Sequence, residues 1–259
     1  MPAPAAREPE KIYEATREEG RRRLSRPLVE LAATALVGGF DVAFGVAAYA
    51  LAAAAIGGGR GRVAGAIAFG IGFVFVVVGK SELFTENFLI PIAGLDRRDL
   101  GSWLKLGELW AVALLLNIGG GLLIAVVLTS HGVLRSGSSQ PLVELAHHIT
   151  HYSTTTSFLS AIVAGALMTL MTWFVEGAAQ SLGVRIVMAW IVGALIVLGA
   201  FNHAIVSTLE LIYGMRFGGG VTYEHLFTNL GLSVAGNMVG GFLLVTFVRA
   251  VQAAEVRGK

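Results

Sequence analysis

The chain has 259 residues, of which 55% are hydrophobic and only 14% are charged. A soluble domain carries roughly a quarter charged residues, so this composition excludes an ordinary soluble protein. The apolar residues stand in blocks long enough to cross a bilayer, which predicts an all-α integral membrane protein with several spans. The sequence contains no cysteine, which excludes disulfides and thiolate metal sites.

The N-terminal segment, residues 1–26, is polar and carries the basic run Arg21-Arg22-Arg23. We interpret it as a solvated tail at the cytoplasmic surface, in which a short amphipathic helix could form around Ile12. The charged N-terminus does not resemble a cleavable signal peptide. Nucleic-acid binding is not expected, because acidic residues nearly balance the basic ones.

A membrane domain at residues 27–250 follows, and its first three spans are predicted near residues 27–56, 62–91 and 102–128. Asp41 falls near the middle of the first span, where a carboxylate needs a partner or a proton. Residues 79–87, Gly-Lys-Ser-Glu-Leu-Phe-Thr-Glu-Asn, interrupt the second span with Lys80, Glu82 and Glu86. Buried membrane charges tend to pair, so we expect Lys80 to neutralise Glu82, Glu86 or Asp41. A vestibule in which Lys80 attracts anions is the alternative.

A long polar link at residues 129–154 holds His131, His147, His148 and His151. His147 and His151 are four residues apart, so a helix would place them on one face, as metal ligands require. No third ligand is evident. We therefore interpret these residues as surface histidines on a loop and predict no metal site.

The second half contains predicted spans near residues 155–174, 186–213 and 227–248, followed by a short cytoplasmic tail at 251–259. Asn202 and His203 interrupt the middle one of these spans. A polar pair inside an apolar span is costly unless it faces protein or water, so a functional site is the default hypothesis.

The interruptions repeat at a constant offset, since the one at His203 follows the one at residues 79–87 by 120 residues. Asn117-Ile-Gly-Gly-Gly precedes Asn237-Met-Val-Gly-Gly by the same 120 residues. We infer two homologous halves of three spans, which must insert with opposite orientations as a 3+3 inverted repeat. Two broken spans at matching positions indicate a transport site near the membrane midplane. We expect Asn117 and Asn237 to support the broken segments.

Lysine and arginine are distributed unevenly between the two predicted sides. Fourteen of the nineteen lie on the side of the termini, and four, Arg60, Arg62, Arg135 and Arg216, lie opposite. Because positive residues favour the cytoplasmic side, both termini are predicted to be cytoplasmic.

At this point the sequence resembles the formate/nitrite transporter family over most of residues 28–250. The resemblance rests on Glu82-Leu83-Phe84-Thr85, on Phe201-Asn202-His203, and on Asn229-Leu230, Gly236-Asn237 and Gly240-Gly241. It implies an aquaporin-like protomer with spans 2 and 5 broken, a homopentamer with one pore in each protomer, and a bacterial inner membrane location. The cargo would be a small monovalent weak-acid anion of the formate or nitrite type.

The same resemblance places His203 on the central histidine of the family. We expect His203 to donate a hydrogen bond to the substrate, with protonation of the anion as a further route. Thr85 would offer a hydroxyl from the opposing break, while Phe84 and Leu83 would form a constriction. The full pore set is His203, Asn202, Thr85, Phe84, Leu83 and Phe201.

The sequence departs from the family pattern at several positions. Asn202 stands where the family commonly has Glu, Ser207 stands where it often has Asn, and a lysine expected before span 4 is missing. Lys80 and Glu86 are not features expected of formate or nitrite channels. These differences indicate a divergent subgroup, similar to uncharacterised bacterial inner-membrane proteins, and leave the substrate, its direction, proton coupling and gating open.

Two other functions fit parts of the pattern. A channel for a neutral or cationic solute such as ammonia or water would suit the carboxylates Asp41, Glu82 and Glu86. A non-transporting structural or sensing membrane protein is the second alternative. No convergent catalytic set and no cofactor-binding motif occurs, so we expect neither an enzyme nor a cofactor.

Overall fold

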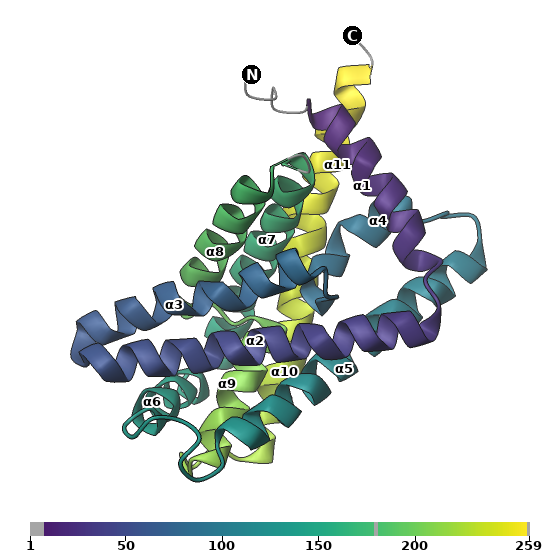
Figure 1. The fold of residues 1–259 in the computed structure, drawn as a ribbon. Helices are drawn as coiled ribbons and strands as arrows, with labels where there is room; N and C mark the ends of the chain where they lie inside the picture. The colour runs from purple at the N-terminus through teal and green to yellow at the C-terminus, as the bar shows by residue number, and fades with distance from the viewer. Residues whose placement is uncertain (1–7, 179–180, 258–259) are drawn as a thin grey trace.

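The computed structural model describes residues 8–178 and 181–257, and Figure 1 shows the fold. Within these two ranges all regular structure is helical. The first elements are α1 (Pro9–Leu24), α2 (Leu28–Ile56), α3 (Gly58–Gly79), a 3₁₀ turn η1 (Phe84–Phe88), α4 (Ile90–Gly94) and α5 (Leu100–Leu128). The later elements are α6 (Ser139–Thr150), α7 (Thr154–Gly177), α8 (Leu182–Leu198), α9 (Ala204–Arg216), α10 (Tyr223–Val239), a π-helical stretch η2 (Gly240–Thr246) and α11 (Phe247–Arg257).

Five helical segments of the described chain are long and apolar enough to cross a membrane, namely α2, α3, α5, α7 and the continuous run Tyr223–Ala254. The span predicted near residues 62–91 is divided among α3, η1 and α4. The span predicted near residues 186–213 is divided between α8, an apolar helix of 17 residues, and α9. Helical structure is thus interrupted in both segments where polar residues interrupt the apolar sequence.

Local chemistry explains where several helices begin. The Asp99 carboxylate accepts hydrogen bonds from Gly101 N at 3.0 Å and Ser102 N at 2.9 Å, which caps α5. Ser153 Oγ accepts from Thr156 N at 3.1 Å at the start of α7. The turn from α2 to α3 passes through Gly57 with a φ of 75°, a left-handed conformation that glycine adopts without strain.

Helix α1 packs against the membrane domain, so the prediction of a solvated tail is wrong for Pro9–Leu24. Gly20 lies against α4, where a Cβ atom would collide with the carbonyl oxygen of Ile90 and approach Gly94 Cα to 3.0 Å. Ile12 packs with Leu89 and Trp173 in a small apolar cluster. The charged sequence looks like a solvated helix because only one narrow face, built around these small and apolar residues, is buried.

The polar link between α5 and α7 also differs from the prediction, because its second part is a helix, α6, rather than a loop. Its buried face consists of Leu142, Leu145, Ala146 and Ile149. His147 Nε2 pairs with Gly219 O at 2.6 Å, and His151 Nδ1 pairs with His147 O at 2.6 Å. No group of three possible metal ligands occurs among the described residues.

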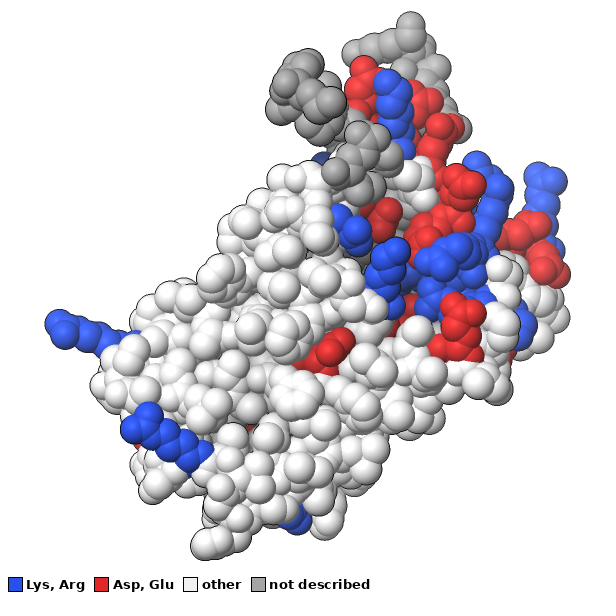
Figure 2. Space-filling model, in the orientation of Figure 1, with Lys and Arg blue, Asp and Glu red and all other residues white. Residues whose placement is uncertain are grey.

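Charged residues gather at one end of the molecule, around α1 and the start of α5, as Figure 2 shows. The face in this view is otherwise almost free of charge, apart from a small acidic patch near its middle and a few basic side chains at the opposite end. Many large apolar side chains are exposed along α2, α3 and α5, including Val37, Phe44, Leu115 and Leu123. An uncharged, apolar belt is what a lipid-embedded surface requires.

Candidate functional site

The two interruptions have the same backbone conformation. Lys80, just after α3, has a φ of 54°, and Ala200, just after α8, has a φ of 49°. Among the described residues these are the only two non-glycine positions with positive φ. In each case the next N–H bonds to a carbonyl five residues back, from Ser81 to Val76 at 3.2 Å and from Phe201 to Ile196 at 2.9 Å. Such strained backbone costs about 1–3 kcal/mol per residue and is concentrated at functional sites.

Asn117 on α5 holds the first interruption in place. Its Oδ1 accepts a hydrogen bond from Phe84 N at 2.8 Å. Its Nδ2 donates to Glu82 O at 2.8 Å and to Ala35 O on α2 at 2.7 Å. The side chain is fully buried, and it satisfies backbone groups that would otherwise be unpaired in an apolar interior.

Asn237 on α10 repeats this arrangement at the second interruption. Its Oδ1 accepts from Ala204 N at 2.8 Å, and its Nδ2 donates to Asn202 O at 3.0 Å and to Ala161 O on α7 at 2.8 Å. The bonded positions in the two interruptions differ by 120 residues, like the two asparagines. These contacts agree with the structural role expected for both side chains.

His203 closes the second interruption by capping α9 with its own ring. Nδ1 accepts hydrogen bonds from Ile205 N at 3.2 Å and Val206 N at 3.1 Å. Because two backbone N–H groups point at Nδ1, this atom carries no proton, and the neutral ring has its hydrogen on Nε2. Nε2 lies 2.8 Å from Thr85 Oγ1, to which it therefore donates.

Aromatic and aliphatic side chains surround this contact. Phe73 on α3 lies with its ring centroid 5.8 Å from that of His203. Leu83 and Phe84 are buried at the first interruption, and Phe84 packs edge-on against Phe88 at 5.2 Å. Phe201 is partly buried.

Two cavities lie at opposite ends of α3 and α8. The α1-side cavity has a volume of about 180 Å³, and its lining includes Val76, Lys80, Ser81, Glu82, Glu86 and Arg185. The α6-side cavity has a volume of about 530 Å³, and its lining includes Tyr49, Arg62, Glu144, His148, Val197 and Ala200. Thr85 follows Glu82 by three residues, and His203 follows Ala200 by three. The buried Thr85–His203 contact thus lies three residues along the chain from a lining residue of each cavity.

Glu82, at the first interruption, is held by two arginines from the N-terminal segment. Arg23 Nη1 lies 2.8 Å from Glu82 Oε1, and Arg26 Nη1 lies 2.7 Å from Oε2. Glu82 is only 1% exposed, so removal of either arginine would leave buried charge incompletely paired. The ion pairs attach α1 to the segment that contacts His203.

The expected pairing of Lys80 with a carboxylate is wrong, because Lys80 forms no ion pair among the described residues and its side chain is exposed at the α1-side cavity. Arg23 approaches Glu86 Oε2 at 4.0 Å in addition to pairing with Glu82. Asp41 accepts a hydrogen bond from Ser81 Oγ at 2.6 Å. Arg23 and Arg26 of the N-terminal segment, and not Lys80, neutralise the carboxylates of the first interruption.

Comparison with known proteins identifies the family. Residues 10–251 match the family described as formate/nitrite transporter. This chain belongs to the formate/nitrite transporter family. Like the family and the channels it resembles, it is a membrane transport protein and not an enzyme.

Individual relatives of this transporter are distant. Inner membrane protein YfdC of Escherichia coli (strain K12) is 26% identical over 251 residues, which cover 95% of this chain and 78% of YfdC. The uncharacterized transporter YrhG of Bacillus subtilis (strain 168) is 28% identical over 257 residues, which cover 94% of this chain and 92% of YrhG. A solved pentameric formate channel with formate bound has the same fold, with a TM-score of 0.73 and 18% identity over 86% of this chain and 96% of that one.

In this transporter the Asn202 side chain supports the second interruption. Its Nδ2 donates to Ser157 Oγ at 2.7 Å and to Asn229 Oδ1 at 2.9 Å, and Asn229 Nδ2 donates back to Asn202 Oδ1 at 3.1 Å. With these bonds made, the amide has little capacity left for a substrate. Asn202 thus joins α7 and α10 to the second interruption. Glu82 similarly joins the first interruption to α1.

Sequence reasoning missed Glu210, a buried carboxylic acid on α9 that is 4% exposed. It forms no hydrogen bond or ion pair within the described residues. Glu210 follows His203 by seven residues and Ser207 by three, which places all three on one face of the helix. That spacing was the signal in the sequence that could have revealed it.

Proposed function

We propose that this transporter is a channel for small monovalent weak-acid anions of the formate or nitrite type, which pass His203 between two broken helices. The observation that carries the proposal is the buried Thr85–His203 contact, which joins the two interruptions, together with a cavity at each end of α3 and α8. A substrate that moves from one cavity to the other must pass this pair. The formate bound in the structurally similar pentameric channel supports the choice of cargo.

The hydrogen-bond directions support a role for both side chains. Since His203 Nε2 donates to Thr85 Oγ1, the threonine hydroxyl hydrogen is free to point toward an incoming oxygen. A bare anion loses its hydration in an apolar constriction at a large cost, and a hydroxyl and an imidazole N–H replace part of that hydration. Protonation of the anion near this pair offers a second route, because the neutral acid crosses the apolar part more easily.

A six-span architecture with a 3+3 inverted repeat fits this function. Its support is the duplicated set of contacts around Asn117 and Asn237. The helices α1 and α6 give further support. Gly20 of α1 packs on Gly94, and Ala146 of α6 packs on Gly214, which follows Gly94 by the same 120 residues. The excess of Lys and Arg beside α1 supports cytoplasmic termini, and the pentameric relative supports a homopentamer.

The test is uptake of formate, nitrite and ammonium into liposomes at one pH on each side of neutrality. The wild-type oligomer should carry formate or nitrite faster on the acidic side. His203→Phe should reduce that uptake by about 10- to 100-fold, the effect of losing a hydrogen bond to a charged group worth about 1.5–3 kcal/mol. His203→Asn is the matched control for folding, because asparagine can still cap α9 but is too short to reach Thr85. Undiminished uptake by both variants, with an intact oligomer, would remove His203 from the mechanism.

Glu210 favours a second candidate, a channel for a neutral or cationic solute such as ammonia. An unpaired intramembrane carboxyl on the same helix face as His203 suits a solute that donates hydrogen bonds. In the liposome assay this function requires ammonium flux to exceed formate and nitrite flux, and Glu210→Gln should lower it. A non-transporting structural or sensing role requires that none of the three solutes moves through the intact oligomer.

A further inference from the structure

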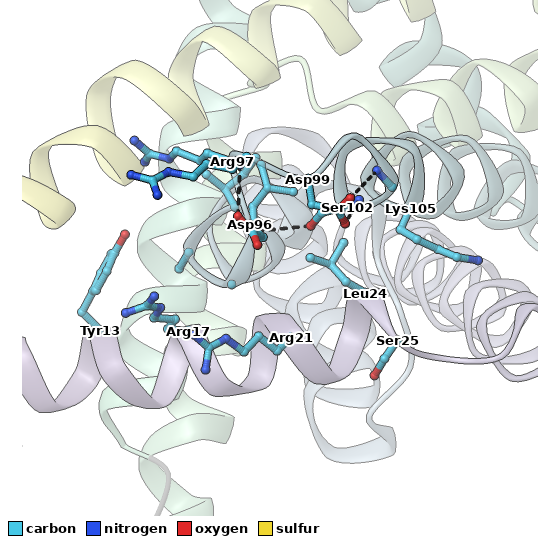
Figure 3. A pocket seen from close by; sticks show the side chains of 16 residues that line it. Tyr13, Arg17, Arg21, Leu24, Ser25, Asp96, Arg97, Asp99, Ser102 and Lys105 are labelled. Atoms are coloured by element: carbon cyan, nitrogen blue, oxygen red, sulfur yellow. Dashed lines mark hydrogen bonds between the residues drawn. The ribbon is translucent and has the colours of Figure 1, made fainter.

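A large cavity, separate from the transport site, lies between α1 and the turn that leads into α5. Its volume is about 720 Å³, and we call it the α1–α5 pocket. Figure 3 shows Arg17 and Arg21 projecting from α1 on the side that faces Asp96, while Arg97 extends from the opposite wall. The two walls belong to segments about 75 residues apart in sequence, which α1 brings together by packing on α4.

Positive charge dominates this pocket. Arg17, Arg21, Arg97 and Arg98 line it, and none of them forms an ion pair within the described residues. Lys105 also lines the pocket but pairs with Glu108 at 2.7 Å, so the four arginines stand against two aspartates, a formal excess of two positive charges. Four unpaired guanidinium groups around one cavity repel one another unless an anion is bound there.

The two aspartates of the lining do not neutralise the arginines directly. Asp99 uses its carboxylate to cap α5 through Gly101 N and Ser102 N. Asp96 Oδ1 accepts a hydrogen bond from the backbone N–H of Arg98 at 3.0 Å. Both carboxylates shape the turn, and the guanidinium groups are left for an external ligand.

An apolar surface begins at the edge of the pocket. Leu100, Trp103 and Leu104, on the first turns of α5, are 73%, 46% and 67% exposed. Trp103 Nε1 donates to Arg97 O at 3.3 Å, so the indole is fixed beside the basic turn. Exposed tryptophan next to arginine marks the level of lipid head groups.

We propose that the α1–α5 pocket binds the phosphate group of an anionic ligand. Arginine suits this chemistry because its planar, forked donors match phosphate oxygens. An anionic phospholipid would place its phosphate among the arginines and its acyl chains on Leu100 and Leu104. A soluble phosphate compound would use the arginines alone. Either ligand would join α1 to the start of α5.

The experiment measures ligand binding to the full-length oligomer purified in a neutral detergent. Short-chain phosphatidylglycerol, short-chain phosphatidylcholine and inorganic phosphate are titrated separately, and Kd is read from the thermal shift. Arg17→Gln/Arg21→Gln and Arg97→Gln/Arg98→Gln each remove two cations, one pair from each wall. Arg60→Gln/Arg135→Gln removes the same charge at the opposite end of the molecule and is the matched control.

Phosphatidylglycerol should bind more tightly than phosphatidylcholine, and each pocket variant should weaken it by roughly 10- to 30-fold, as expected for two cations at a phosphate. The control should remain within about twofold of the wild type by the same reasoning. Binding of inorganic phosphate with the same dependence on the arginines would identify a soluble ligand instead of a lipid. Equal effects of the pocket and control variants, or binding of neither phosphatidylglycerol nor inorganic phosphate, would overturn the proposal. The two pocket variants alter different elements, so misassembly of one leaves the other as a valid test.

Discussion

His203 Nε2 lies 2.8 Å from Thr85 Oγ1, although 118 residues separate the two side chains in the sequence. Thr85 lies at the first interruption, which the buried Asn117 holds in place. His203 lies at the second interruption, which the buried Asn237 holds in place. The contact therefore joins the two interruptions directly. Because His203 donates in this contact, the hydroxyl hydrogen of Thr85 remains available to a substrate.

Thr85→Val should reduce anion uptake by about 10-fold while the oligomer stays assembled, because valine has the same shape but lacks the hydroxyl that meets the substrate. Thr85→Ser keeps the hydroxyl and should retain most of the flux. Initial rates of formate and nitrite uptake into liposomes provide the measurement. Equal rates for the valine and serine variants would show that the hydroxyl takes no part in conduction.

The sequence allowed prediction of the helical class, of the two places where polar residues interrupt apolar segments, and of Asn117 and Asn237 as equivalent supports of these places. These features leave long-range regularities in the chain, since apolar blocks have bilayer length and polar interruptions recur at one offset. Such regularities of composition and spacing are visible without a structure. The capping of α9 by the His203 ring could not be predicted in this way, because no rule of spacing distinguishes a capping histidine from any other.

The packing of α1 and the lack of an ion pair at Lys80 within the described residues could not be predicted, because both depend on contacts between distant segments. Arg23 and Arg26 look like solvated charges, yet Arg23 lies on α1, whose small residue Gly20 packs on α4, and Arg26 follows just after this helix. Their partner, Glu82, is more than 50 residues away. Once two arginines pair with Glu82, Lys80 has no buried partner and faces the α1-side cavity.

Asn237→Ala should destabilise the oligomer by roughly 2–4 kcal/mol, because it leaves three buried backbone groups without partners. Ser233→Ala is the matched control on the same helix. Ser233 is fully buried, but its hydroxyl bonds only to Leu230 O within α10. Thermal unfolding followed by size-exclusion chromatography should show a clear fall in Tm for the asparagine variant alone. Equal shifts for both variants would contradict the structural role of Asn237.

Lys80→Met should leave oligomer stability unchanged, since Lys80 forms no ion pair within the described residues. It should lower anion uptake by up to about tenfold at low ionic strength, because a cation at the α1-side cavity raises the local anion concentration. The difference should shrink as salt is added. Lys11→Met, which removes the same charge from the exposed part of α1, is the control and should have no such effect. A fall in Tm without a change in uptake would restore the ion-pair role first assigned to Lys80.

The stability of helix α1 should depend on pH through Glu19, which pairs with Arg22 and Arg23 on the same helix. Burial raises the pKa of Glu19, but hydrogen bonds and charge from Arg22 and Arg23 outweigh this effect and hold it below its ordinary value of 4.5. Glu19 is ionised in the folded state, with Arg22 Nη2 at 2.6 Å and Arg23 Nε at 3.2 Å from Oε1. A lowered folded pKa means that this stabilisation is complete above pH 4.5 and is lost as the pH falls through the folded pKa.

Hydrogen exchange of the α1 amides, corrected for the intrinsic rate, should therefore be constant from neutral pH down to 4.5 and should increase below it. Glu19→Gln should exchange faster at neutral pH and lose the part of the pH dependence that belongs to this carboxylate. The difference between the two proteins isolates Glu19 from the other carboxylates near Arg23. If the wild type and Glu19→Gln follow parallel pH curves, the carboxylate does not secure α1, and the ion pairs of Glu82 with Arg23 and Arg26 alone must hold the helix against the domain.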